Sequence, residues 1–164
     1  MKCRGFEICS AFANEGLTIP ERSTKASAGY DFACAEDTVI PSYFKLLFDK
    51  ITKKSEEPMK PTLVKTGIKS YMAEDEVLFL YNRSSNPGKK GLVMANSVGV
   101  IDSDYYNNPD NEGHIMFAFY NFYPFDITIK KGEKIGQGVF EKFLIADNDN
   151  ASGTRQGGFG STGK

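Results

Sequence analysis

Short hydrophobic runs separated by turn residues make up most of the chain. The runs rich in β-branched and aromatic residues lie at positions 6–9, 30–35, 63–64, 77–81, 115–122, 127–129 and 135–143. Such residues favour β-strands. Between the runs lie Pro124, a Lys-Lys-Gly-Glu segment at 130–133 and an Asn-Pro-Gly segment at 86–88, all typical of turns. The pattern therefore predicts a mainly β fold.

The run at 115–122 has apolar or aromatic side chains on both faces. The alternating positions are Ile115, Phe117 and Phe119 on one face and Met116, Ala118 and Tyr120 on the other. A strand with one solvated face carries polar residues at every second position. This run does not, so we expect a strand covered on both sides, and one possible cover is another subunit.

Residues 43–54 depart from the strand pattern. Their apolar positions recur at helical spacing, at Phe44, Leu47, Phe48 and Ile51. The spacing predicts a short amphipathic helix, and the polar, proline-containing stretch at 55–61 predicts an exposed loop after it. The favoured interpretation is that the apolar stripe packs on the chain's own strands. A protein partner for residues 43–61 is the alternative.

Size and charge narrow the class of protein. A chain of 164 residues with 40% hydrophobic residues is long enough for one domain with a buried core. The net charge of -1 and the pI of about 5.9 argue against neutralisation of a nucleic-acid backbone, but they allow a small phosphorylated ligand. No apolar run is long enough to span a bilayer or to act as a signal segment. We expect an intracellular, cytoplasmic protein, in the host cytoplasm if the source is viral.

Cysteine and histidine provide few candidate sites. Cys3, Cys9 and Cys34 are odd in number and lack metal-type spacing, so they predict neither a disulfide framework nor a zinc site. The single histidine, His114, excludes a multi-histidine metal site and disfavours a Ser/His or Cys/His nucleophile. A structural or surface histidine is the better interpretation.

Polar residues with ligand chemistry border the β-branched segment at 96–105. The amide of Asn96 offers a donor and an acceptor, which suit the edge of a pyrimidine. The carboxylate of Asp102 can orient and deprotonate a water molecule beside a phosphate chain, and Tyr105 can pack against a sugar. An ordinary β-turn is the alternative, because Asn and Asp are common turn residues.

Two further segments carry phosphate-type donors. Arg83, Ser84 and Ser85 follow the strand at 77–81, and Gln137 follows a turn. In residues 155–164, Arg155 and Phe159 stand among four glycines and two hydroxyls, a composition suited to closing over an anion. The alternatives are a solvated arginine beside turn serines and a disordered chain end.

The order of these segments carries more information than any one of them. Residues 28–31, 83–85, 96–105, 132–137 and 155–163 resemble, in sequence order, the five motifs of the homotrimeric dUTP pyrophosphatase (dUTPase) family. The third and fifth motifs are the specific ones. The resemblance implies a β-clip or jelly-roll-like fold, assembled as a homotrimer with active sites at subunit interfaces. It further implies one β domain at 1–150, with an extra segment near 43–61, and a flexible C-terminal lid at 151–164.

The resemblance also implies a reaction, the Mg²⁺-dependent hydrolysis of dUTP to dUMP and pyrophosphate. This reaction limits uracil incorporation into DNA and supplies dUMP for thymidylate synthesis. Carried onto matching positions, Asp102 activates the attacking water, and Asp31 helps to position magnesium through water while the substrate phosphates hold it. The uracil and deoxyribose residues are Asn96, Val100, Ile101, Tyr105, Met116 and Phe159. The phosphate residues are Arg83, Ser84, Ser85, Gln137, Arg155, Gly160, Ser161 and Thr162.

Two other functions are compatible with parts of this pattern. A dCTP deaminase shares the fold and the Arg-Ser-Ser element, but it uses a glutamate in its third motif, where Ala95 and Asn96 offer no acid. A catalytically idle trimer that binds a nucleotide, or a protein through residues 43–61, is the other alternative.

Overall fold

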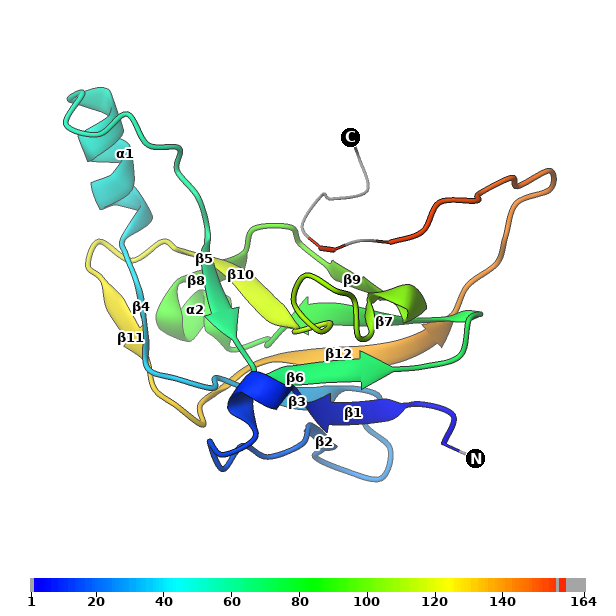
Figure 1. The fold of residues 1–164 in the computed structure, drawn as a ribbon. Coiled ribbons are helices and arrows are strands. Elements are labelled where there is room, and N and C mark those ends of the chain that lie inside the picture. Colours follow the sequence, from blue (N-terminus) through cyan, green and yellow to red (C-terminus); the bar gives the residue numbers. More distant parts are fainter. Residues whose placement is uncertain (1, 156, 159–164) are drawn as a thin grey trace.

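Antiparallel strand pairing organises the chain. The structure is a computed structural model that describes residues 2–155 and 157–158, and within these residues twelve strands form four sheets (Figure 1). The largest sheet has the order β2 (Glu21–Arg22), β3 (Tyr30–Ala33), β12 (Lys134–Lys142), β7 (Glu76–Asn82) and β9 (Gly99–Asp102). The three-stranded sheet has the order β5 (Thr62–Lys65), β10 (Met116–Asn121) and β8 (Leu92–Met94). Two pairs complete the fold, β1 (Gly5–Ile8) with β6 (Ile68–Tyr71) and β4 (Thr38–Ile40) with β11 (Ile127–Ile129). The predicted mainly β architecture is confirmed.

The core lies where these sheets meet. Phe32 on β3, Phe117 and Phe119 on β10 and Leu78 on β7 are completely buried. The rings of Phe117 and Phe119 stack with centroids 6.1 Å apart, and Phe32 meets Phe117 at 5.7 Å. Each buried phenylalanine contributes roughly 1.5–3 kcal/mol of transfer free energy. The opposite face of β10 is half-buried at Met116 and Tyr120, so this strand has the two covered faces expected of it.

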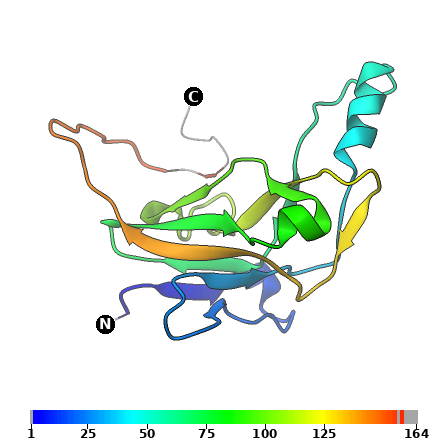
Figure 2. The same ribbon diagram turned by 180° about the vertical axis from the view of Figure 1, so that it is seen from behind.

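Helix α1 (Tyr43–Ile51) confirms the predicted helix but not its predicted packing. The first turn is anchored, since Ser42 Oγ donates to the Tyr123 carbonyl at 2.7 Å. Beyond that turn the helix stands away from the strands in both views (Figures 1 and 2). The exposed fractions of its apolar residues are 52% for Phe44, 58% for Phe48 and 70% for Ile51. The interpretation that this stripe packs on the chain's own strands was therefore wrong. A protein partner for residues 43–61 stays a prediction.

The Asn-Pro-Gly segment at 86–88 was predicted as a turn and is instead the start of helix α2 (Asn86–Lys90). The amide of Asn86 is buried and donates to Asn82 Oδ1 at 2.7 Å and to the Ile135 carbonyl at 2.8 Å. Proline is tolerated in the first helical turn, and Gly91 ends the helix with φ 62°. Neither α1 nor α2, nor any other helix of the described residues, is long and apolar enough to cross a membrane.

His114 has a structural role and gives the fold a pH dependence. Its Nε2 accepts from the backbone N–H of Gly67 at 2.9 Å, and its ring packs on Phe12. Burial, assisted by Lys65 and opposed by Glu36 and Glu112, lowers the pKa of His114 to about 4. The ordinary pKa of histidine is 6.5. Between about pH 6.5 and pH 4 the unfolded chain therefore binds a proton that the folded chain does not bind.

We therefore expect the free energy of unfolding to fall as the pH is lowered from 6.5 towards 4. The expected loss is on the order of 1–3 kcal/mol after allowance for partial solvent exposure. Urea unfolding at a series of pH values from 7 to 4 measures it. The His114→Gln variant keeps a hydrogen-bond acceptor but does not titrate, so its stability should depend less on pH. Equal pH slopes in the two proteins would contradict this role for His114.

Candidate active site

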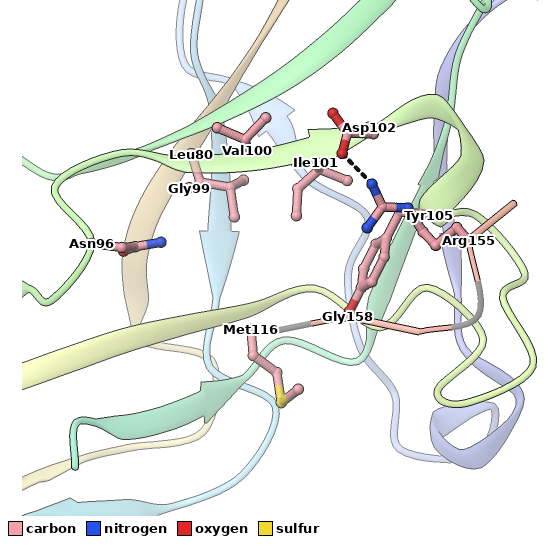
Figure 3. A pocket seen from close by; sticks show the side chains of 10 residues that line it. All are labelled: Leu80, Asn96, Gly99, Val100, Ile101, Asp102, Tyr105, Met116, Arg155 and Gly158. Atoms are coloured by element: carbon pink, nitrogen blue, oxygen red, sulfur yellow. Dashed lines mark hydrogen bonds and ion pairs between the residues drawn. The ribbon is translucent and has the colours of Figure 1, made fainter. Parts of the chain in front are cut away.

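A cavity of about 240 Å³ lies between β9, the following turn of 3-10 helix η2 (Ser103–Tyr105) and the start of β10. It is lined by Leu80, Asn96, Gly99, Val100, Ile101, Asp102, Tyr105, Met116, Arg155 and Gly158 (Figure 3). The sequence predicted a shared site for Asn96, Asp102 and Tyr105, and the structure brings these residues together. Val100, Ile101 and Met116, the other described residues assigned to the base and sugar, line the same cavity.

The hairpin geometry explains how Asn96 and Asp102 reach one cavity. Strand β9 pairs with β7 from Gly99 opposite Leu80 to Asp102 opposite Val77. Asn96 lies in the turn before β9, where Ser97 has φ 59° and the Val98 N–H donates to the Asn96 carbonyl at 2.6 Å. The turn interpretation and the ligand interpretation of this segment are therefore compatible. The backbone makes the turn, and the Asn96 side chain lines the cavity.

Tyr105 forms a fixed wall of this cavity. Its side chain is buried, with 6% of the residue exposed. Its hydroxyl donates to the His114 carbonyl at 3.1 Å and accepts from Asn111 Nδ2 at 2.7 Å. Burial raises the pKa of this hydroxyl, so it stays protonated at neutral pH and offers a neutral, flat ring.

The chain after β12 turns back across the sheet and brings Arg155 into the cavity (Figures 1 and 3). Its guanidinium forms ion pairs with Asp102 and, through Nε, with Asp104 Oδ1 at 2.6 Å. Burial opposes the charge, but the contacts with Asp104 and Asp102 raise the pKa of Arg155. Gly158 lies against the Tyr105 ring, where an added Cβ would come within 2.7 Å of Cε2.

This arrangement differs from the one implied by the resemblance. The resemblance assigned Arg155 to the substrate phosphates, whereas here it pairs with Asp102 of its own chain. A guanidinium binds carboxylate and phosphate with the same two-pronged geometry, so a triphosphate can compete with Asp102 for it. The other assigned residues of the fifth motif, Phe159, Gly160, Ser161 and Thr162, lie outside the described residues.

A second cavity, of about 200 Å³, gathers four of the residues predicted to hold phosphates. It is lined by Ser23, Asp31, Arg83, Ser84, Ser85 and Gln137. Gln137 on β12 lies opposite Asp31 on β3, and Arg83 follows the end of neighbouring β7. Gly29 in the first motif leaves room for Gln137, because a Cβ there would lie 2.2 Å from Gln137 Oε1. The structure therefore brings these predicted residues together, and Ser23 joins them.

The second cavity has the electrostatics of an anion site. Lys134 Nζ and Ser23 Oγ both donate to Asp31 Oδ2, at 2.6 and 2.9 Å. Burial opposes ionisation of Asp31, but these hydrogen bonds and the charge of Arg83 keep its pKa below the ordinary value. Because the Asp31 carboxylate is paired with Lys134, the charge of Arg83 and the hydroxyls of Ser84 and Ser85 are available to phosphate oxygens. Ser23 and Lys134 were missed, and in the case of Lys134 the partner, Asp31, lies 103 positions away in the sequence.

The two cavities share no lining residue. The first has the residues suited to a base, a sugar and a water molecule, and the second has the phosphate donors. Among the described residues, no group of three or more His, Cys, Asp or Glu side chains could hold a metal ion without other ligands. A metal in this protein would need most of its ligands from a bound molecule and water.

Comparison with known proteins identifies relatives over the whole chain. The dUTPase family model matches residues 15–163. A deoxyuridine 5'-triphosphate nucleotidohydrolase of Lactococcus lactis is 50% identical over 165 residues, which cover 99% of this chain and 99% of the relative. A protein of the same name from Tolumonas auensis is 31% identical over 171 residues, which cover 100% of this chain and 99% of the relative.

Solved structures give the same result. The crystal structure of dUTPase from Streptococcus mutans has 45% sequence identity and a TM-score of 0.74, and the match covers 88% of this chain and 99% of that one. The dUTPase from phage phi11 of S. aureus shares the fold, with 18% identity, a TM-score of 0.66 and a match covering 93% of this chain and 98% of that one. A structural Mg(II) ion is coordinated in the phage protein.

Proposed function

This chain belongs to the dUTPase family and hydrolyses dUTP to dUMP and pyrophosphate, and we propose that it does so in active sites assembled between copies of the chain in a homotrimer. One observation carries the proposal. The residues suited to the base and the water line one cavity, and those suited to the phosphates line another. A single dUTP needs both sets, so a second copy must bring its phosphate cavity to the first cavity of its neighbour.

The first cavity selects the nucleoside. The Asn96 amide pairs with the edge of uracil, and backbone groups at Val100, Ile101 and Met116 complete the contacts to the base. The Tyr105 ring lies beneath deoxyribose and leaves no room for a 2′-hydroxyl. Its burial and its two hydrogen bonds support this role, because a ring that cannot move aside excludes a larger sugar.

Asp102 supplies the chemistry. Its carboxylate takes a proton from a water molecule whose oxygen attacks the α-phosphorus, and the bond from that phosphorus to the bridging oxygen breaks to release pyrophosphate. The donors of the second cavity, Arg83, Ser84, Ser85 and Gln137, hold the phosphates, and Ser84 assists the leaving pyrophosphate. Because Asp102 must be free to accept a proton, Arg155 has to leave it and bind the terminal phosphate.

Magnesium fits this donor set as an ion held mainly by the substrate phosphates. Mg²⁺ keeps several waters and needs only one or two carboxylates. Asp31 is the carboxylate that we assign to it, through water, since its two hydrogen-bond donors both bind Oδ2. When bound, the ion neutralises phosphate charge. A cytoplasmic location agrees with this substrate and completes the proposal.

Mixed trimers test whether sites form between chains. Asp102→Asn and Arg83→Ala, each inactive alone, are co-expressed with different tags and the mixed trimers are purified. If a site takes Asp102 from one chain and Arg83 from the next, about a third of wild-type pyrophosphate release should return, because a mixed trimer of either composition has one site of three that combines both intact residues.

A matched pair provides the control. Asp102→Asn mixed with Asn96→Ala places both changes in the same cavity, so no site regains both residues and no activity should return. Absence of recovery in the first mixture would disprove shared sites.

The substrate is tested separately, since ammonia release from dCTP without pyrophosphate would identify a deaminase. Among the described residues lining the first cavity, Asp102 is the one carboxylate.

A further inference from the structure

The hairpin tip at 106–113 is built around two asparagine side chains. Asn108 Oδ1 accepts from the backbone N–H groups of Asp110 and Asn111, both at 3.1 Å. Asn111 Oδ1 accepts from the Gly113 N–H at 3.1 Å and from Asn108 Nδ2 at 2.9 Å. A backbone N–H can only donate, so the contact with Gly113 identifies the oxygen of Asn111 and fixes which way its amide faces.

The other end of that amide contacts Tyr105, which lines the first cavity. Asn111 Nδ2 donates to the Tyr105 hydroxyl at 2.7 Å. A phenol has one proton, and Asn111 Nδ2 cannot accept it, so the Tyr105 proton goes to the His114 carbonyl 3.1 Å away. The ring is thus held at its far end by one donor and one acceptor.

The tip that carries Asn111 is itself clamped to the body of the protein. Lys69, which is 8% exposed, donates to Glu112 Oε1 at 2.5 Å and to Asn107 Oδ1 at 2.7 Å. Glu112 Oε2 accepts from the Ser10 hydroxyl at 2.6 Å and from its backbone N–H at 2.9 Å. The hydrogen bonds from Lys69 and Ser10 lower the pKa of Glu112 to about 2, so the clamp is charged at neutral pH.

We propose that Asn111 is a specificity-determining positioning residue, which holds the Tyr105 hydroxyl and so keeps the ring in the place where it excludes a 2′-hydroxyl. The inference rests on the proposed function of Tyr105. Asn111 does not line the cavity and acts only through that ring. Loss of its donor lets the ring tilt, which admits UTP more than it harms dUTP.

Two isosteric substitutions on the same tip test the proposal. Asn111→Asp keeps the oxygen that caps the loop but replaces the donor to Tyr105 by an acceptor, so the one phenol proton cannot serve both residue 111 and the His114 carbonyl and one of the two contacts is lost. Asn107→Asp makes the same chemical change and keeps the acceptor for Lys69, without contacting Tyr105. We expect Asn111→Asp to lower the ratio of kcat/KM for dUTP to that for UTP by about tenfold, and Asn107→Asp to change it by less than about twofold.

The Tyr105→Phe background shows whether Asn111 acts through the hydroxyl. There Asn111→Asp should cause no further fall in the ratio, because the contact is already absent. Calorimetric binding of dUMP and UMP measures the same selectivity without turnover, and the melting temperature of each variant identifies any loss of folding.

Three results overturn the proposal. These are an unchanged ratio in folded Asn111→Asp, an equal fall in Asn107→Asp, and a fall that persists in the Tyr105→Phe background. Each leaves the proposed function standing as long as the wild type prefers dUTP to UTP. A wild type without that preference would instead overturn the role of Tyr105 and, with it, that of Asn111.

Discussion

The Asp102→Asn variant should lose about 10²–10⁴-fold in dUTP hydrolysis while binding dUTP nearly as tightly as the wild type. An amide has the shape of a carboxylate but cannot take a proton from water. Asp102 ends strand β9 and its side chain is 49% exposed, so the substitution leaves the core untouched. Magnesium-dependent pyrophosphate release measures the rate, and calorimetry with dUTP measures the binding.

Asp104→Asn is the matched control for this prediction. Asp104 also pairs with Arg155 but does not line the cavity. The Asp104→Asn variant therefore reports the effect of a weakened Arg155 contact while the general base, Asp102, is kept. Its rate should stay within a few-fold of the wild type. If Asp102→Asn kept a tenth or more of the wild-type rate, the assignment of the base would be wrong. A wild type that binds dUTP without hydrolysing it would favour the idle nucleotide-binding trimer.

The long apolar strands could be predicted from the sequence, and so could the short strands β1, β3, β5 and β11, but other short strands such as β6 could not. Strands β7, β10 and β12 have six to nine residues and clear β-branched or aromatic runs. Strand β6 has four residues, and two of them, Lys69 and Ser70, are polar yet buried. Their burial depends on partners such as Glu112 and the Gly5 carbonyl, which the sequence does not place beside them.

Helices α1 and α2 show the same limit in two ways. The helical period of α1 was visible, but whether its apolar stripe meets the body depends on the path of the chain around it. In α2 the Asn-Pro-Gly chemistry is typical of a turn, and what favours the helix is the bond from Asn86 to the Ile135 carbonyl, 49 residues away. Local residue preference cannot anticipate such a bond.

The candidate site likewise has residues that could be predicted from the sequence and residues that could not. Asn96, Asp102 and Tyr105 lie within ten positions of one another on one hairpin, and their chemistry marked them as a group. The residues that contact Tyr105 and Arg155 from outside the cavity had no such mark. Asn111 was one of several polar residues in a loop, and Asp104 appeared only as a turn former. Their roles depend on side-chain directions, which the structure supplies.

Removal of residues 155–164 separates two opposite roles for the tail. The described part of the tail places Arg155 on Asp102, so a tail that only plugs the cavity should raise the rate of hydrolysis when it is deleted. A tail that closes over the triphosphate should instead lower kcat/KM by about 10²-fold or more, because it takes away donors to the developing phosphate charge.

We expect the fall in rate. A triphosphate carries more charge than the two carboxylates of Asp102 and Asp104 and draws the guanidinium away from them. The truncated chain should keep the wild-type melting temperature and oligomeric state, since the buried core residues lie between Cys9 and Ile135. Arg155→Lys in the full chain serves as the partial variant. It keeps the charge but lacks the planar fork, so its rate should lie between those of the wild type and the truncation. Steady-state assays with dUTP decide the sign, and a truncated enzyme as fast as the wild type or faster would show that the tail obstructs the site and does not complete it.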